Sequence, residues 1–265
     1  MSETKIEWTE RVWNPVTGCT KISVGCKNCF ASRMAKRLAG RYGYPAAPHQ
    51  FDVTLHPERL DLPMKWKKPS MIFVDSMSDL FHEKIDDKFI FEVFTIMWIS
   101  PLHIFQILTK RPQRMCELLN FWLKRREEIE KSSWFIPSPN VWLGVSVENQ
   151  ETADERIPWL LKTPAAVKFV SAEPLLGPIN LRHSINRNNF GPYEWDLTHR
   201  INWVICGCES GPGARPMDIE WARSLRNQCL GVDTPFFLKQ MVIDGKLVKM
   251  PELDGKQWHD FPEMR

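Results

Sequence analysis

Six apolar runs, each ending in polar or charged residues, constrain the fold of this chain more than any other feature. Apolar strands that alternate with helical stretches are typical of a parallel sheet covered on both faces. A seventh strand is expected just before the loop that begins at Gly18. Seven units favour a full or partial (β/α) barrel, formed as one domain by residues 1–265, over a small open sheet. The runs occupy residues 71–79, 104–111, 141–149, 167–174, 203–211 and 235–240.

Four stretches between these runs are expected to be helical, because their apolar residues recur at helical spacing and Ser-Pro or Thr-Pro pairs end two of them. The segment 180–202 is rich in Asn, Arg and His and lacks apolar periodicity. It is expected to be an insertion loop over the barrel mouth, either a plain surface excursion or a binding loop. The helical stretches are residues 86–99, 113–130, 153–161 and 218–229.

Composition sets limits on location and partners. The 265 residues are 43% apolar, which permits a sizeable core. We expect a cytoplasmic protein without a membrane partner, because no stretch resembles a signal peptide and no apolar run is long enough to cross a bilayer. A net charge of +3 permits nucleic-acid binding without requiring it. Seven cysteines favour reduced thiols with metal or redox roles over a disulfide framework.

Twelve tryptophans are many for this length, and five of them lie in polar surroundings. Such rings could stack on bases or adenine, or they could pack as large residues beneath loops. The five are Trp8, Trp13, Trp66, Trp195 and Trp258.

Polar side chains follow each predicted strand. In a (β/α) barrel the carboxyl ends of the strands meet at the mouth, where functional groups gather. Some of these residues also suit helix N-caps. The strand-end residues of most interest are Asp75, Ser76, Ser78, Lys110, Arg111, Ser146, Glu148, Asn149, Glu173, Glu209, Ser210, Lys239 and Gln240.

Three cysteines lie close together in the segment 18–30, which we call the cysteine loop. Cys19, Cys26 and Cys29 have the spacing C-x6-C-x2-C, and the residues around them are mostly polar. Closely spaced thiols in a polar loop indicate a ligand role. Three thiolates with one open position suit an iron–sulfur cluster that binds a further group, or an incomplete zinc site.

The other four cysteines are expected to be buried. Cys116 and Cys229 lie on helical stretches and are expected in the core. Cys206 and Cys208 share one face of a strand, which leaves a second metal site as the alternative to simple burial. His82 is expected to be a buried, hydrogen-bonded histidine rather than a metal ligand.

The cysteine loop resembles the radical SAM superfamily, whose usual motif is C-x3-C-x2-C. The first gap here is six residues, and Asn28 stands where that superfamily commonly has an aromatic residue, with Phe30 after the last cysteine. The resemblance implies a [4Fe–4S] cluster on Cys19, Cys26 and Cys29. It also implies that S-adenosylmethionine (SAM) chelates the open iron and is cleaved to a 5′-deoxyadenosyl radical.

Nearly the whole chain resembles a phage-associated three-cysteine-motif family of unassigned function. That family usually has a glycine pair before Glu-Ser-Gly, where this chain has Cys206-Gly207-Cys208. The resemblance implies a (β/α) barrel of the radical SAM type and supplies no substrate. The segments that carry it are 13–19, 73–83, 108–112, 144–149, 171–178, 209–211 and 237–240.

The resemblance also implies roles for the strand-end residues. Carboxylates and hydroxyls suit the ammonium and ribose of SAM, and cations suit its carboxylate or a substrate phosphate. Five charged groups are expected to line one polar substrate pocket: Lys110, Arg111, Glu173, Glu209 and Lys239. The expected roles are cofactor binding for Asp75, Ser76, Ser78, Lys110, Ser146, Glu148 and Asn149; substrate binding for Arg111, Ser210 and Gln240; and proton transfer for Glu173, Glu209 and Lys239.

The expected function is that of a radical SAM enzyme with a nucleic acid or nucleotide as the first expectation for its substrate. An electron donor such as a flavodoxin or ferredoxin would be a partner. One alternative is a non-catalytic barrel, stabilised by zinc or a cluster, that binds nucleic acid or a protein. A third interpretation is a SAM-binding enzyme without radical chemistry.

Overall fold

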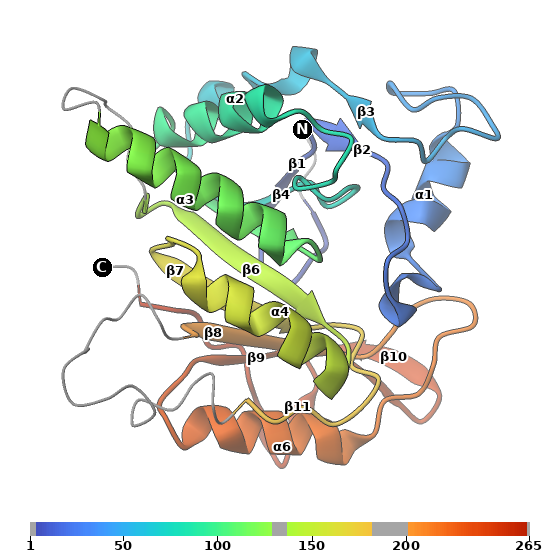
Figure 1. The fold of residues 1–265 in the computed structure, drawn as a ribbon. Helices are drawn as coiled ribbons and strands as arrows, with labels where there is room; N and C mark the ends of the chain where they lie inside the picture. The colour runs from blue at the N-terminus through green and yellow to red at the C-terminus, as the bar shows by residue number, and fades with distance from the viewer. Residues whose placement is uncertain (1–3, 129–136, 182–200, 264–265) are drawn as a thin grey trace.

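An eight-stranded sheet curls into a half-barrel and organises the molecule (Figure 1). The computed structural model describes residues 4–128, 137–181 and 201–263. Seven neighbouring strands run parallel and the last pairs antiparallel. In sheet order the strands are β1 (Arg11–Trp13), β4 (Met71–Val74), β5 (Ile104–Thr109), β6 (Val141–Val147), β7 (Val167–Ala172), β8 (Trp203–Gly207), β9 (Phe236–Ile243) and β10 (Lys246–Lys249).

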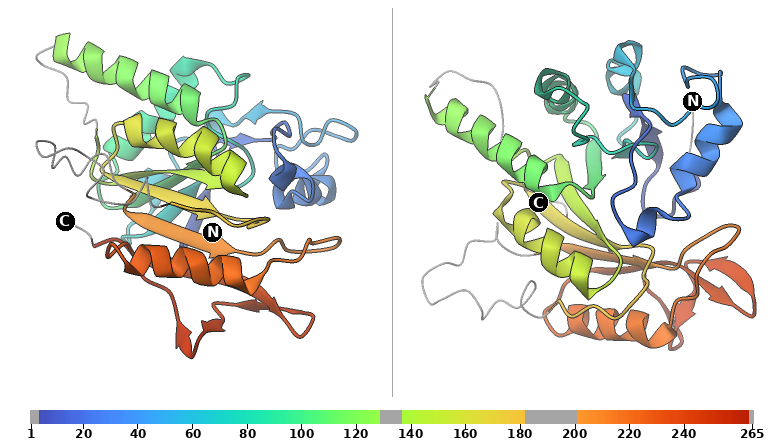
Figure 2. Two further views of the ribbon diagram at one scale, coloured as in Figure 1. Left: turned by 60° about the horizontal axis from the view of Figure 1, so that its bottom comes forward. Right: turned by 45° about the vertical axis from the view of Figure 1, so that its right-hand side comes forward.

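Four helices follow strands and cover the outer face of the sheet, whereas α1 stands apart from them at the open side (Figure 2). Asp86, Asn149 and Asp218 cap three of the four by accepting backbone N–H groups. The four predicted helical stretches are confirmed. The helices are α1 (Phe30–Leu38), α2 (Asp87–Trp98), α3 (Pro112–Glu128), α4 (Gln150–Lys162) and α6 (Ile219–Leu230).

Short elements complete the described chain. Three single-turn 3-10 helices and two small sheets lie outside the main sheet. None of the described helices is both long and apolar enough to span a bilayer. The short elements are η1 (Val24–Cys26), η2 (Pro57–Arg59), η3 (Pro63–Lys65), β2 (Val16–Thr17), β3 (Thr54–Leu55), β11 (Glu252–Leu253) and β12 (Lys256–Gln257).

Side chains along each strand point alternately into two separate cores, one on each face of the sheet. In β6, Val141, Leu143 and Val145 belong to the large core beneath the helices, whereas Trp142 belongs to a separate aromatic cluster on the inner face. By the same alternation Ser146 and the residues level with it on neighbouring strands lie further along the inner face. The half-barrel is therefore filled with aromatic rings towards the amino ends of its strands and is polar at the carboxyl ends. The inner cluster contains Trp8, Trp142, Phe169, Trp203, Ile205 and Phe237.

Gly144 makes room for this aromatic cluster, because a Cβ there would lie 2.5 Å from the ring of Phe169. We expect Gly144→Ala to destabilise the protein by about 1–3 kcal/mol through overpacking. Urea unfolding would measure the loss. Gly231→Ala is the matched control, because the nearest atoms to a Cβ at Gly231 lie at an ordinary 3.5 Å. Equal stability of the two variants would contradict this account of the inner core.

Four of the five tryptophans that lie in polar stretches of the sequence are buried or partly buried. Trp8, Trp13 and Trp258 are only 2%, 1% and 8% exposed. Trp66 packs against the large core with the Arg11 guanidinium over its ring. Packing in the interior is thus confirmed for Trp8, Trp13 and Trp258, which are too buried to stack on bases, and Trp66 is partly buried. Trp195 lies outside the described residues, as does most of the expected insertion loop 180–202.

The remaining cysteines also behave as predicted. Cys116 is 5% exposed, and Cys206, Cys208 and Cys229 are 0–1% exposed. Cys206 belongs to the core beneath the helices, together with Cys229 of α6. Burial raises the pKa of Cys208 to about 11. These four thiols are core residues.

Candidate functional site at the carboxyl ends of the strands

The cysteine loop is bound to the carboxyl ends of the strands. Gly18 forms a bridge with Ser78, just beyond β4, and its N–H donates to the Met77 carbonyl. The loop then continues into α1, whose first residue is Phe30. Figure 1 shows this segment running from β2 past the tip of β6. The three thiols therefore lie at the edge of the sheet where the sequence predicts the site.

Two of the three thiols lie next to cations from the end of β5. The Nη1 of Arg111 is 3.6 Å from the Sγ of Cys19, and the Nζ of Lys110 is 3.9 Å from the Sγ of Cys26. Burial and the nearby Asp79 raise the pKa of Cys19 to about 12 despite Arg111. Burial also acts to raise the pKa of Cys26, but Lys110 and hydrogen bonds outweigh it and lower that pKa below its usual value.

The third thiol, Cys29, occupies the N-cap position of α1 and makes no side-chain capping bond. All three cysteines are partly exposed. Among the residues that the structure describes, no group of three or more His, Cys, Asp or Glu side chains lies close enough together to hold a metal ion. The thiols share one loop without forming a ready-made metal site.

Glu148 anchors the first half of the cysteine loop. Its carboxylate is fully buried and accepts a hydrogen bond of 2.8 Å from the Ser23 hydroxyl. It also pairs with Lys110 and with Arg156, whose Nη1 lies 3.1 Å from Oε2. A Cβ on Gly25 would clash with this carboxylate. Burial acts to raise the pKa of Glu148, but the two cations hold it below its usual value.

Glu209 anchors the second half of the loop. Its Oε2 accepts hydrogen bonds of 2.8 Å from Asn28, which lies between Cys26 and Cys29, and of 3.0 Å from the Nε of Arg215. Hydrogen bonds from Arg215, joined by that from Asn28, lower the pKa of Glu209 to about 2. Two carboxylates from strand ends thus hold the cysteine loop from two sides.

The segment after Glu209 also holds α1. The Nη2 of Arg33 donates a hydrogen bond of 2.8 Å to the Ser210 carbonyl, and Asn28 donates one of 2.8 Å to the Gly213 carbonyl. A Cβ on Gly211 would clash with the guanidinium of Arg33. The contact of Ser210 with α1 is therefore made by its backbone.

Asp79 fixes the direction of Arg111. Its Oδ1 accepts a hydrogen bond of 2.6 Å from Thr109, and its Oδ2 accepts bonds from the Lys110 N–H at 3.0 Å and from the Arg111 Nη1 at 3.1 Å. Arg111 also donates a bond of 2.8 Å to Thr20 in the cysteine loop. His82 is buried and lies 2.9 Å from the Thr20 hydroxyl, which confirms its expected place.

Asp75 has a buried carboxylate oxygen without a hydrogen-bond partner among the described residues. It follows β4 with a φ of 57° and is 3% exposed. Its Oδ1 accepts a hydrogen bond of 3.0 Å from the Val16 N–H, and its Oδ2 has no hydrogen-bond partner among the described residues. Burial raises the pKa of Asp75 well above its usual value. Its neighbours Ser76 and Ser78 donate to Asn14 and to the Val16 carbonyl, both at 3.1 Å.

A further ion pair joins Glu173, which follows β7, to Lys239 within β9. The Nζ of Lys239 is 2.5 Å from the Oε1 of Glu173, and the Nε2 of Gln240 is 3.3 Å from the same oxygen. The Ser146 hydroxyl donates a bond of 3.2 Å to the Glu173 carbonyl. Asn149, expected to contact SAM, instead uses its side chain to cap α4.

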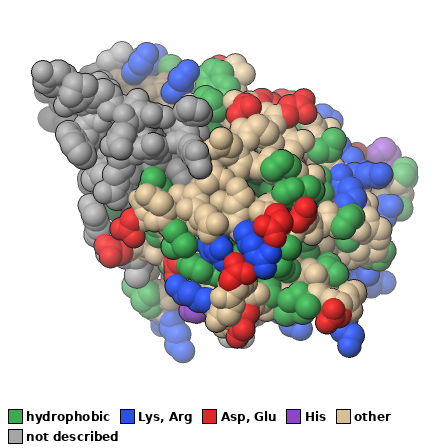
Figure 3. All heavy atoms as spheres, turned by 90° about the horizontal axis from the view of Figure 1, so that it is seen from below, with side chains coloured by type: hydrophobic (Ala, Val, Ile, Leu, Met, Phe, Trp, Pro, Cys, Tyr) green, Lys and Arg blue, Asp and Glu red, His purple; other side chains and the backbone are tan. Residues whose placement is uncertain are grey.

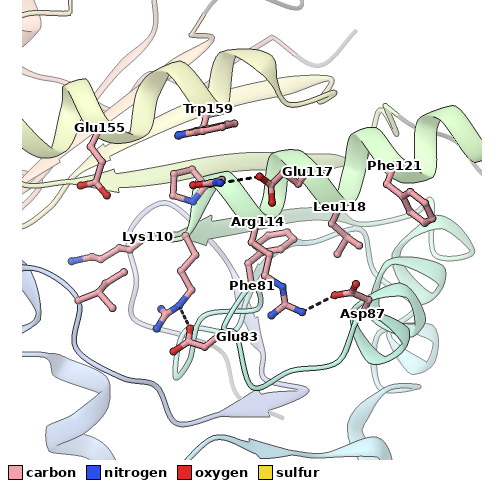
Figure 4. Close-up of a pocket in the computed structure, with 14 residues that line it drawn as sticks. Phe81, Glu83, Asp87, Lys110, Arg114, Glu117, Leu118, Phe121, Glu155 and Trp159 are labelled. Atoms are coloured by element: carbon pink, nitrogen blue, oxygen red, sulfur yellow. Dashed lines mark hydrogen bonds and ion pairs between the residues drawn. The ribbon is translucent and has the colours of Figure 1, made fainter.

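A cavity of about 860 Å³ opens beside the cysteine loop, between the segment 81–87, α3 and α4 (Figure 4). Lys110 and Arg111 line it together with Ile22 of the loop. Glu173, Glu209 and Lys239 do not line it. Of the five charges expected around one substrate pocket, this cavity therefore brings together two.

Four residues of the arrangement were not predicted from the sequence. Ser23 and Asn28 look like ordinary polar loop residues, and Arg156 and Arg215 look like surface cations. Their partners lie 125, 181, 8 and 6 positions away in the sequence. The two arginines are close to their partners in the sequence, but no regular element joins them, because Glu148 precedes α4 and the segment from Glu209 to Arg215 precedes α6.

No curated protein and no solved structure gives a significant match. A family model described as a protein of unknown function, DUF5131, matches residues 3–262. Because that match spans nearly the whole half-barrel and both ends of the site, the chain belongs to the DUF5131 family.

Proposed function

We propose that this protein is a radical SAM enzyme whose [4Fe–4S] cluster is held by Cys19, Cys26 and Cys29. The observation that carries the proposal is the position of the cysteine loop, clamped over the carboxyl ends of a parallel half-barrel. That edge is where barrel enzymes gather their functional groups. The donor set fits the cluster, because three thiolates leave one iron open.

The charges around the thiols favour the same proposal. Arg111 and Lys110 lie within 4 Å of Cys19 and Cys26, and they would offset the negative charge of thiolate ligands. Because the thiols do not converge in this structure, cluster binding would draw them together within the loop. Glu148 and Glu209 act in this proposal as positioning residues, since their oxygens already bind the loop and nearby arginines.

When bound, such a cluster supplies the electron that cleaves SAM into methionine and a 5′-deoxyadenosyl radical. Asp75 would accept the ammonium of SAM on its unpartnered Oδ2. Ser146 lies on the inner face and would reach the ribose. Glu173 and Lys239 form a partly exposed ion pair that would meet the substrate. A flavodoxin- or ferredoxin-type protein would be the electron donor.

Loss of any of the three cysteines is expected to abolish cluster retention. After anaerobic reconstitution, the wild-type protein should carry about four irons per chain. Cys19→Ala, Cys26→Ala and Cys29→Ala should each retain little iron and lose the absorption in the visible range. Iron analysis and absorption spectra are the measurements. Cys116→Ala is the matched control, because Cys116 is buried in α3.

Full iron and an unchanged spectrum in all three single variants would remove the cluster from these residues. A colourless wild-type protein that binds zinc through the same cysteines would instead support the non-catalytic alternative.

A further inference from the structure

The positive charge of this chain is concentrated in one segment. Residues 11–51 contain seven Lys and Arg and no Asp or Glu. The rest of the chain carries 28 Lys and Arg against 32 Asp and Glu, so it is slightly acidic. The small overall charge of +3 therefore hides a strongly basic segment that includes the cysteine loop and α1.

Five of the seven cations are exposed, and we call them the basic surface. The other two are engaged: Arg11 donates to Ser70, and Arg33 donates to the Ser210 carbonyl. In the described part of the chain no acidic side chain forms an ion pair with any of the five, and Lys21 donates only to a backbone carbonyl. The basic surface consists of Lys21, Lys27, Lys36, Arg37 and Arg41.

The helix α1 presents part of this surface on one side. Ala31 and Ala35 bury its inner face against Tyr44 and Met77. Lys36 and Arg37 lie on the opposite face, and Arg41 lies three residues beyond the end of the helix. In the view from below, blue Lys and Arg side chains with little red occupy the end of the molecule where Figure 1 places α1 (Figure 3).

Exposed apolar side chains lie among these cations. Phe30, the first residue of α1, is 56% exposed, and Tyr42, next to Arg41, is 77% exposed. Ile22 and Val24 of the cysteine loop are 46% and 54% exposed. Cations interleaved with open aromatic rings are the combination that binds single strands, because phosphates pair with the cations and bases stack on the rings.

We propose that the basic surface binds single-stranded nucleic acid, with Phe30 and Tyr42 as stacking residues. An acidic protein would also complement the charge, but cations and open rings that alternate along one segment favour a single strand, in which phosphates and bases alternate in the same way. The proposal goes beyond the proposed function, because binding here needs neither cluster nor SAM. Nucleic acid bound at this surface would lie against the cysteine loop.

Fluorescence anisotropy tests the proposal with the protein as purified and a labelled single-stranded oligonucleotide of about 16 nucleotides. Reversing Lys36, Arg37 and Arg41 to Glu should weaken binding more than about tenfold. It should also reduce the slope of log K against log salt by about 2, because three phosphate contacts are lost. Phe30→Ala with Tyr42→Ala should weaken binding by about thirtyfold or more and leave the salt slope unchanged.

The matched control reverses Lys67, Lys68 and Lys246, which are also exposed and change the net charge equally. It should retain most of the affinity and the wild-type salt slope. The proposal fails if this control loses as much affinity as the first variant, or if the wild-type protein does not bind the oligonucleotide at low salt. Binding of a poly-glutamate peptide without binding of the oligonucleotide would identify an acidic protein as the partner and would also overturn it. Both outcomes are independent of iron binding by the cysteines.

Discussion

Glu148→Ala is expected to destabilise the protein by about 3–5 kcal/mol, because it would leave Lys110 and Arg156 without their shared carboxylate. Arg156 is 1% exposed and cannot turn to water. The Ser23 hydroxyl would lose its acceptor as well, so the cysteine loop should loosen. Urea unfolding measures the first effect, and faster proteolysis within the loop measures the second.

Glu155, which precedes Arg156 on α4, provides a matched control. Glu155 also approaches Arg156, at 3.9 Å, but its side chain is 65% exposed. Glu155→Ala should change the stability by less than about 0.5 kcal/mol.

The pH dependence of the free energy of unfolding gives a further check on the role of Glu148. Because the folded-state pKa of Glu148 lies below the ordinary 4.5, its contribution is present above pH 4.5 and is lost as the pH falls further. A wild-type protein that loses no more stability in acid than Glu148→Ala would contradict this assignment.

Asp75→Asn is expected to have the opposite sign and to stabilise the protein by about 1–3 kcal/mol at neutral pH. The wild-type carboxylate is buried, and one oxygen has no partner among the described residues. Asn keeps the acceptor for the Val16 N–H, removes the charge and tolerates the positive φ. Urea unfolding against pH is the measurement.

The stability difference between the wild-type protein and Asp75→Asn depends on pH, because the pKa of Asp75 is raised in the folded state. Its folded state holds the proton more tightly, so the wild-type protein is relatively most stable below pH 3.8 and loses that advantage as the pH rises through the folded-state pKa. The gain from Asp75→Asn should therefore appear above pH 3.8 and grow. Under the proposed function, calorimetry should show weaker SAM binding by the same variant. Reduced stability with unchanged SAM affinity would make Asp75 an ordinary structural residue.

The strands were predictable because burial on both faces leaves a continuous apolar run in the sequence. Runs such as 141–147 are short for a helix and lie between turn signals, which favours strands, and six of them are strands in the structure. A partial barrel is confirmed, whereas a full one was equally allowed by the sequence. Strand β10 was not predicted, although the Asp244-Gly245 turn between two strand-like segments was a hairpin signal.

The site was predictable in position but not in its pairings. Strand-end polarity located Glu148, Glu173, Glu209 and Lys239 at the correct edge of the sheet. The cysteine-loop partners of Glu148 and Glu209, Ser23 and Asn28, lie more than 100 residues away, and a sequence pattern carries no information on such pairs. The spacing of Asn149 from Thr152 fits a helix cap, and the structure shows that cap; SAM binding by Asn149 stays a prediction from the family resemblance.

The two carboxylate anchors impose an order on assembly. The contact between Asn28 and Glu209 joins residues 181 positions apart, and that between Ser23 and Glu148 joins residues 125 apart. During synthesis the start of the loop can be held early, because Gly18 and Thr20 contact residues 77–111. The contacts of Ser23 and Asn28 must wait until β6 and then β8 have joined the sheet, so the part of the loop that carries Cys26 and Cys29 is anchored last.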